Sequence, residues 1–308
     1  MNTTVVVRSV GEATERACVQ LLEEVFGKEN VFLVKNVTPF SKAVGKTFEI
    51  GLVQNKKWTL AIDADVLIFQ DKVPLFIELA NEHISQCDEK TFCLEGMLFD
   101  KFSDNYREVG LHLFQTRFLE KALEFVEEGT CELRPETFVK SNMSENGYRF
   151  YVTNLRLGIH DFFQYPASIV KKAILHCKKH RHVKKMICLW RKNSDLDRDF
   201  YWAMKGVEIS DASNSKNVIV DRVFMDELVK KYLPDCESEQ TYKIDKNILE
   251  ETLSTYNKNE ELPISFSVFG KRNFFKFLFS VKKRGNRKVL MVFGVDVFSF
   301  ERQRRRTP

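Results

Sequence analysis

The chain lacks the residue pairs and runs that mark several protein classes. None of its 7 cysteines forms a Cys-x-x-Cys pair, so neither a zinc ribbon nor a disulfide framework is indicated, and a reducing, cytoplasmic setting is expected. With 13 glycines and 7 prolines in 308 residues, collagen-like and low-complexity chains are excluded. No apolar run is long enough for a membrane-spanning helix, and the first ten residues do not have the pattern of a signal peptide.

Three sequence motifs of nucleotide-binding or hydrolytic proteins are also missing. The first predicted strand is followed by Arg8-Ser9-Val10-Gly11-Glu12, which is not the G-x-G-x-x-G of dinucleotide-binding proteins. Neither the G-x-x-x-x-G-K-[ST] of P-loop proteins nor the G-x-S-x-G of α/β-hydrolases occurs. These three classes are therefore not expected.

The formal charge of +5 comes from one end of the chain. Residues 266–308 hold twelve Lys and Arg and two acids, whereas the rest has 36 basic and 41 acidic residues. Residues 264–300 also hold 9 of the 27 Phe. This composition suits a helix lying peripherally on an anionic membrane, here the inner face, or a β-hairpin turning at residues 284–287. Nucleic acid is not an expected partner, because no recognition module is present.

Strands and helices alternate over the first 70 residues. Strands are predicted at residues 4–7, 31–34 and 58–62, and helices at 12–26 and at about 41–54, the second capped by Ser41. Strands joined by helices pair in parallel, and ligands bind at their carboxyl ends. We therefore expect an α/β fold with a Rossmann-like, mostly parallel sheet flanked by helices.

The later part of the chain is more mixed. The patterns predict helices at residues 74–83, 114–128 and 167–182, a strand at 92–99, and a strand or hairpin at 147–160. Three regions are expected: a core at 1–165, a helical continuation at 166–262, and a basic, Phe-rich segment at 263–308.

The sharpest motif is Asp63-Ala64-Asp65, which follows the predicted strand at 58–62 directly. Two neighbouring carboxylates repel each other, so stability alone does not favour them at the end of an apolar strand. A divalent cation relieves this repulsion, and oxygen ligands suit Mg²⁺ or Mn²⁺ shared with substrate phosphates. A solvated turn is the alternative interpretation.

With this motif, residues 1–165 resemble the GT-A glycosyltransferases, in a compact form of the family-2-like group. The opening strand through Ser9, the second strand ending in Asn36 and the helix at 43–54 match as well. The resemblance implies a nucleotide-diphosphate sugar as donor and Mn²⁺ or Mg²⁺ as cofactor. It implies that Asp65 binds the metal and that Asp63 contacts the ribose or the metal.

The same resemblance implies further site residues. Arg8, Ser9 and Asn36 would line the nucleotide pocket, and Lys42 or Lys46 would neutralise phosphate. His160 lies where GT-A enzymes often carry a late histidine that completes the metal site. The acidic pair usual at the end of the second strand is replaced here by Lys35-Asn36.

Sugar transfer also requires a carboxylate that takes a proton from the acceptor hydroxyl. Asp161 and Glu136 are the first candidates, and Glu95 is the third. His112 alternates with apolar neighbours and is interpreted as a pocket or core-edge residue. His176 and His180 share a helix face, but the surrounding Lys and Arg disfavour a zinc site there.

The leading hypothesis is a metal-dependent glycosyltransferase of the hexosyltransferase class. It would transfer a sugar from a nucleotide donor to a glycan or lipid-linked acceptor in surface polysaccharide synthesis. Two alternatives stay open. One is a sugar nucleotidyltransferase on the same framework, and the other is a non-catalytic binding protein on a transferase fold.

Overall fold

The computed structural model describes most of the chain. The described residues are 1–87, 90–129, 134–179, 183–212, 222–234, 244–257, 264–268, 279–284, 287–292 and 295–301. The strands of the main sheet are β1 (Thr3–Ser9), β2 (Val31–Lys35), β3 (Trp58–Asp63), β4 (Val66–Ile68), β5 (Thr91–Asp100), β6 (Asn105–Arg107), β7 (Leu111–Gln115), β8 (Arg149–His160) and β9 (Phe266–Val268). The helices are α1 (Glu15–Phe26), α2 (Phe40–Gln54), α3 (Lys72–Cys87), α4 (Leu119–Glu128), α5 (Pro135–Glu145), α6 (Pro166–Lys179), α7 (Val183–Asn193), α8 (Arg198–Ala212), α9 (Arg222–Tyr232) and α10 (Lys246–Tyr256).

The central sheet is mixed, not mostly parallel. Its order is β2-β1-β3-β7-β5-β8-β4, with β6 added to β5 and β9 to β8. β1 pairs in parallel with β2 and β3, and β5 pairs in parallel with β8, as the helical connections require. β7 runs antiparallel between β3 and β5, and β4 runs antiparallel along β8. The prediction of a mostly parallel sheet was therefore wrong: β1 with β2, β1 with β3 and β5 with β8 are parallel, and the other five pairs of this sheet among the described residues are antiparallel.

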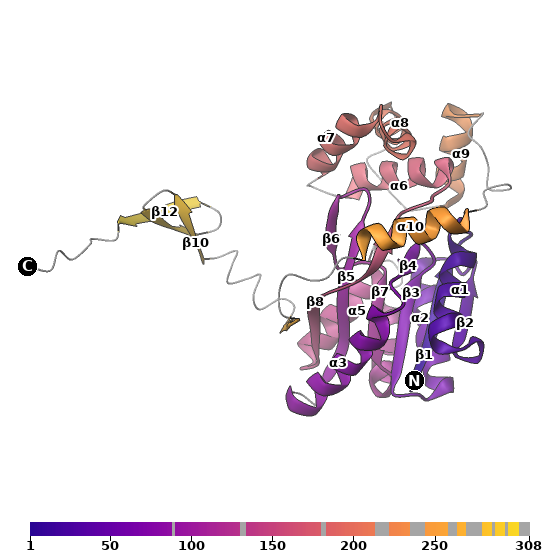
Figure 1. Cartoon of the computed structure of the whole chain (residues 1–308), viewed down its shortest axis with the longest axis vertical. Helices are drawn as coiled ribbons and strands as arrows, with labels where there is room; N and C mark the ends of the chain where they lie inside the picture. Colours follow the sequence, from indigo (N-terminus) through magenta and orange to yellow (C-terminus); the bar gives the residue numbers. More distant parts are fainter. Residues whose placement is uncertain are drawn as a thin grey trace, which may run out of the picture.

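Alternation of side chains along the strands builds a core on each face of the sheet. Val5 and Val7 point to the face covered by α1 and α3, whereas Val6 points to the face covered by α2. The α2 face continues under α4 and α5, where Phe48 and Phe114 pack edge to face. The arrangement is a sheet between two layers of helices (Figure 1).

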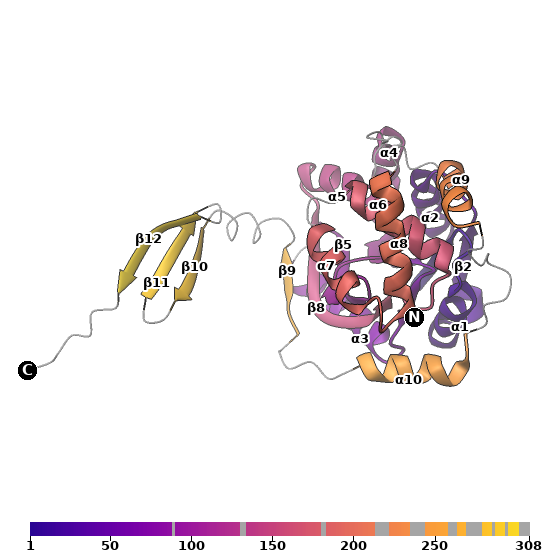
Figure 2. The ribbon, with the colours of Figure 1, turned by 90° about the horizontal axis from the view of Figure 1, so that it is seen from above.

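A third group of helices, α6 to α9, lies beyond the carboxyl ends of β5 and β8 (Figure 1). Seen from that end, α6, α7 and α8 lie over the sheet (Figure 2). The indole of Trp190 in α7 is fully buried and donates a hydrogen bond of 2.8 Å to the carbonyl of Phe102, just after β5. This contact fixes the helical group over the edge of the sheet where the strands end.

Two local predictions are corrected by the structure. Ser41 was expected to cap the second helix, but α2 is preceded by Pro39 and Ser41 lies inside its first turn. The helix expected at residues 114–128 begins only at Leu119, because Leu111–Gln115 forms β7 and Thr116–Phe118 forms a 3₁₀ turn. Gly27 does end α1, with a φ of 82° that favours glycine.

Of the two structures considered for the basic C-terminal segment, the structure shows the hairpin. β10 (Phe279–Arg284) and β11 (Arg287–Val292) are antiparallel and paired up to Arg284 and Arg287, and β12 (Val295–Glu301) completes a small sheet. The Phe-rich stretch at residues 269–278 lies outside the described residues. Among the described residues, no helix has both the length and the apolar character that crossing a membrane requires.

Candidate functional site

Four strands of the sheet end close together and bring polar side chains to one edge. β1 ends at Arg8 and Ser9, and β3 ends at Asp63, which pairs with Arg8 in the register of the two strands. In the same way β5 ends at Asp100, whose register partner on β8 is His160. The pairing of the strands therefore dictates two pairs of neighbouring polar residues at this edge.

The Asp63-Ala64-Asp65 turn is held by its backbone. The Asp63 amide donates to the carbonyl of Gly110 at 2.8 Å, and the Ala64 amide donates to the carbonyl of Arg8 at 2.9 Å. The buried hydroxyl of Thr14 donates to the carbonyl of Ala64 at 2.7 Å. The two aspartates are fixed in this way, but their carboxylates face different partners.

The Asp65 carboxylate belongs to a buried group that we call the aspartate cluster; its members are Asp65, Asp100, His160, Asp161 and Lys172. His160 Nε2 lies 3.4 Å from Asp65 Oδ1, and the Asp161 amide donates to the carbonyl of Asp65 at 3.2 Å. Asp65, His160 and Asp161 each bring one potential metal-ligating atom within 4.8 Å of the others.

His160 is oriented by a second carboxylate. Its Nδ1 lies 3.0 Å from Asp100 Oδ2, and Asp100 is itself held by the amide of Ser103 at 2.8 Å and by Arg107 at 3.2 Å. This arrangement leaves Nε2 directed at Asp65. A carboxylate that fixes the other ring nitrogen is the usual support of a metal-binding histidine.

Lys172 of α6 provides the positive charge of the aspartate cluster. Its Nζ donates to Asp65 Oδ2 at 2.8 Å and also pairs with Asp161 Oδ1. Burial disfavours the charged carboxylate, but Lys172 and His160 outweigh it and hold the pKa of Asp65 well below its ordinary range. Burial alone would lower the pKa of His160, yet Asp161 and Asp65 raise it to about 10.

Within the described residues, Asp65 Oδ1 is buried and accepts no hydrogen bond of good geometry. Such an atom is costly in the interior of a protein unless it has a partner. Together with His160 Nε2 it forms an oxygen and nitrogen pair aimed at the same point. Once His160 gives up its Nε2 proton, as metal binding requires, this donor set fits a divalent cation such as Mn²⁺ or Mg²⁺.

The Asp63 carboxylate belongs to a second group, the arginine cluster; its members are Arg8, Asp63, Glu95, His112, Glu136 and Lys140. Arg8 Nη2 lies 2.8 Å from Asp63 Oδ1, and Nη1 pairs with Glu136 of α5. The Arg8 side chain is only 3% exposed. The guanidinium therefore joins the end of β3 to α5 in the interior.

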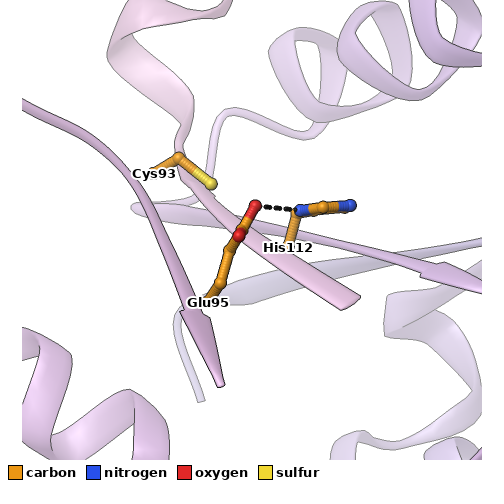
Figure 3. A group of neighbouring side chains, drawn as sticks. All are labelled: Cys93, Glu95 and His112. Atoms are coloured by element: carbon orange, nitrogen blue, oxygen red, sulfur yellow. Dashed lines mark hydrogen bonds and ion pairs between the residues drawn. The ribbon is translucent and has the colours of Figure 1, made fainter. Parts of the chain in front are cut away.

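His112 connects the ion pair of Arg8 and Glu136 to the sheet. Its Nε2 lies 3.1 Å from Glu136 and its Nδ1 lies 2.6 Å from Glu95, the facing residue on β5. Figure 3 shows the contact between Glu95 and His112, with the thiol of Cys93 directed at the same place. Cys93, Glu95 and His112 form the second potential metal-ligating group among the described residues. Lys140 already pairs with Glu95, so this carboxylate has its cation.

In the arginine cluster, neighbouring cations lower the pKa values of two of the three carboxyl groups. Burial opposes every charge, but His112 and Lys140 lower the pKa of Glu95 to about 2. Arg8 and His112 likewise hold the pKa of Glu136 well below its ordinary range against burial. Asp63 is the exception, because burial raises its pKa to about 6 despite Arg8. With His112 protonated, the cluster holds three anions and three cations. The anions are Asp63, Glu95 and Glu136, and the cations are Arg8, His112 and Lys140.

Gly110 lies between the two clusters. Its φ is +63°, and a Cβ there would lie 3.5 Å from both Asp63 Oδ2 and His160 Cδ2, and 2.9 Å from Val66 Cγ2. The absence of a side chain therefore lets the turn before β7 pass between the two charged groups.

The remaining residues expected from the sequence lie apart from the aspartate cluster. The Ser9 hydroxyl donates to Glu12 at 2.8 Å and also pairs with Glu15. Asn36 adopts a φ of 58° and its amide donates to the carbonyl of Ser9 at 2.8 Å. Lys42 is exposed on α2. The structure thus brings Asp65, His160 and Asp161 together, and Arg8, Asp63 and Glu136 together.

Lys172, Asp100 and Lys140 were not singled out from the sequence. Lys172 was included only in the helix predicted at residues 167–182. Asp100 and Lys140 lie 60 and 45 residues from the partners that they contact, His160 and Glu95. No local motif contains these pairs, and only the strand register or the helix packing brings them together.

The chain is similar in structure to several solved transferases, at low identity. A glycosyltransferase involved in glycosylation of the major capsid of PBCV-1 has 13% identity and a TM-score of 0.33, over 52% of this chain and 94% of that one. A protein from Desulfovibrio desulfuricans G20, assigned as a nucleotide-diphospho-sugar transferase, has 11% identity and a TM-score of 0.32, over 65% and 98%. Mannose-1-phosphate geranyltransferase from Thermus thermophilus has 12% identity and a TM-score of 0.33, over 51% and 75%.

The resemblance expected from the sequence is thus found among solved structures. No family model matches the chain, and no curated protein matches it.

Proposed function

We propose that the chain is a metal-dependent glycosyltransferase that uses a nucleotide-diphosphate sugar. The observation that carries the proposal is the aspartate cluster. It places two carboxylates and an oriented imidazole at the carboxyl ends of strands in an α/β sheet, where such folds bind their ligands. The buried Asp65 Oδ1 accepts no hydrogen bond of good geometry among the described residues, and it faces His160.

Asp65 and His160 would hold the cation, Mn²⁺ or Mg²⁺. When bound, the ion supplies positive charge to the diphosphate leaving group of the donor. Asp63 faces Arg8 and not His160, and its side chain is 29% exposed, so we assign Asp63, with Ser9, Asn36 and Lys42, to contacts with the nucleotide. Arg8, which is enclosed, positions Asp63.

The acceptor hydroxyl must lose its proton to a carboxylate. Of the two candidates, Glu136 is a weak base, because Arg8 and His112 hold its pKa well below its ordinary range. We therefore assign proton acceptance to Asp161, and to Glu136 the positioning of Arg8. Asp161 adopts a φ of 67°, an uncommon conformation for a residue with a side chain, and such strain is concentrated at functional sites.

The acceptor is proposed to be a glycan or a lipid-linked sugar of a surface polysaccharide. We further propose that the protein works in the cytoplasm, with its basic C-terminal segment contacting an anionic membrane peripherally. Residues 266–308 carry a large excess of Lys and Arg, which is the basis for this part of the proposal.

The test is calorimetric titration of the intact chain with UDP, GDP and TDP, each with and without Mn²⁺. We expect at least one nucleoside diphosphate to bind, and to bind more tightly when Mn²⁺ is present. Asp65→Asn should remove the Mn²⁺-dependent part of the affinity, because a neutral amide is a poor ligand for a hard cation.

The matched control is Asp71→Asn, at an acid that is 59% exposed and pairs with Lys72. This variant should bind as the wild type does. If none of the diphosphates binds with Mn²⁺, the proposed function is wrong. Binding of nucleoside triphosphates alone would instead favour a nucleotidyltransferase.

A further inference from the structure

The Lys172 ammonium lies beside Asp65, at the carboxylate oxygen that His160 does not face. Nζ donates to Asp65 Oδ2 at 2.8 Å and pairs with Asp161 on its other side. The carboxylates of Asp65 and Asp161 are 12% and 2% exposed. Within the described part of the chain, Lys172 and His160 are the positive groups paired with these two carboxylates.

The parts of this cluster differ in how firmly they are held. Asp65 and Asp161 are joined through their backbones, and His160 is fixed by Asp100. Lys172 reaches the site by a flexible four-carbon stem from α6, and its side chain is 29% exposed. The ammonium can therefore leave towards solvent without moving the backbone, whereas the carboxylates stay in place.

We propose that Lys172 is a built-in competitor of the divalent cation. It neutralises Asp65 and Asp161 in the cation-free protein and gives up Asp65 when a divalent cation binds there. This inference rests on the cation site of the proposed function, and it adds how that site is regulated. One ammonium contributes a single charge to the two carboxylates, so a doubly charged ion bound at Asp65 Oδ1 and His160 attracts Asp65 more strongly and repels the ammonium from it.

The competition has a consequence for the order of binding. A displaced ammonium beside the site needs an anionic partner, and a diphosphate is one. The cation alone should therefore bind weakly to the wild type, and more tightly when a diphosphate is present to pair with Lys172. The protein would therefore bind the free cation weakly and hold it tightly chiefly when the diphosphate substrate is also bound.

The experiment measures the affinity of the intact chain for Mn²⁺ alone, by calorimetry, in Lys172→Met, Lys172→Arg and Lys171→Met. Lys171 is the matched control, because it neighbours Lys172 on α6 but pairs with Asp226 of α9. We expect Lys172→Met to lower the Kd for Mn²⁺ about tenfold or more, equal to about 1.4 kcal/mol. Lys172→Arg keeps a competing cation and should stay near the wild-type Kd, as should Lys171→Met.

Thermal unfolding keeps the test decisive if Lys172→Met is unstable. Removal of the ammonium leaves two buried carboxylates facing each other, so this variant should melt below Lys171→Met without Mn²⁺. Added Mn²⁺ should then raise its Tm by more than it raises the wild-type Tm, since ligands stabilise the state that they bind.

The inference is overturned if Lys172→Met binds Mn²⁺ no more tightly than the wild type, or if Mn²⁺ does not restore its Tm. Its failure is distinguishable from failure of the proposed function. A chain that binds no nucleoside diphosphate, but binds Mn²⁺ more tightly in Lys172→Met, refutes the transferase and retains the competition.

Discussion

The aspartate cluster and the arginine cluster lie at the same edge of the sheet, yet their cations are attached differently. In the arginine cluster the central cation is Arg8, which is 3% exposed and lies between Asp63 and Glu136. In the aspartate cluster the central cation is Lys172, which is 29% exposed. The Arg8 side chain is enclosed, whereas the Lys172 side chain is partly exposed to solvent.

This difference separates a permanent charge from an exchangeable one. The Arg8 guanidinium is enclosed and paired with two carboxylates, so it has no path to solvent that keeps either pair. The Lys172 side chain is partly exposed, so its ammonium can turn towards solvent when another cation takes over the carboxylates. We conclude that the arginine cluster holds the end of β3 and α5 together, and that the aspartate cluster is where a cation is exchanged.

The largest expected effect is that of Arg8→Met. It leaves the partly buried carboxylates of Asp63 and Glu136 without their cation, and breaking a buried pair typically costs about 3–5 kcal/mol of stability, which is the upper bound here. Urea unfolding measures this loss. Arg16→Met, at an exposed arginine of α1, should change the free energy of unfolding little. A loss for Arg8→Met no larger than for Arg16→Met would contradict the structural role of the arginine cluster.

A second effect, of about 1.5–3 kcal/mol at neutral pH, is expected for Glu95→Gln, because it removes a charged partner of His112 and Lys140. The pKa of Glu95 is lowered from 4.5 to about 2, so its contribution to stability is present above pH 4.5 and is lost as the pH falls towards 2. Unfolding measured from pH 7 to 2 should therefore show a flatter acid limb in Glu95→Gln.

The control for this pH profile is Glu124→Gln, at an acid that is 58% exposed and pairs with Lys121. Its profile should run parallel to that of the wild type. If Glu95→Gln also gave a parallel profile, Glu95 would not be the group whose protonation weakens the arginine cluster.

A smaller effect is expected at the boundary between the clusters. Gly110→Ala places a residue with a side chain at a φ of +63°, which costs about 1–2 kcal/mol. Its Cβ would also lie 2.9 Å from Val66 Cγ2. Gly11→Ala is the matched control, because Gly11 has a φ of +99° and nothing within 4 Å of its Cβ position. Equal losses of stability would show that the contact with Val66 contributes nothing.

The first third of the fold could be predicted because its signals are local. The apolar runs of β1 and β3, the helix stopped by Gly27 and the Asp63-Ala64-Asp65 turn are each contained in a few consecutive residues. β7 was missed because a five-residue strand runs directly into a 3₁₀ turn and a helix. Its one signal was the alternation of His112 with Leu111 and Leu113, which is the period of a strand.

The sequence predicted three residues of the aspartate cluster but not the lysine that pairs with them. Asp65, His160 and Asp161 were each proposed from the sequence, and the structure brings them together. Lys172 lies 107 residues from Asp65, and no spacing rule relates the two. The division of Asp63 and Asp65 between two clusters could not be foreseen either, since it depends on Arg8 facing one carboxylate and α6 covering the other.

The most direct test of the central claim compares Asp63→Asn with Asp65→Asn in a calorimetric titration of the intact chain with Mn²⁺. If the aspartate cluster exchanges its cation and the arginine cluster does not, Asp65→Asn abolishes binding and Asp63→Asn binds Mn²⁺ with nearly the wild-type Kd. Loss of binding in Asp63→Asn with retention in Asp65→Asn would place the exchangeable cation beside Arg8 and contradict the account.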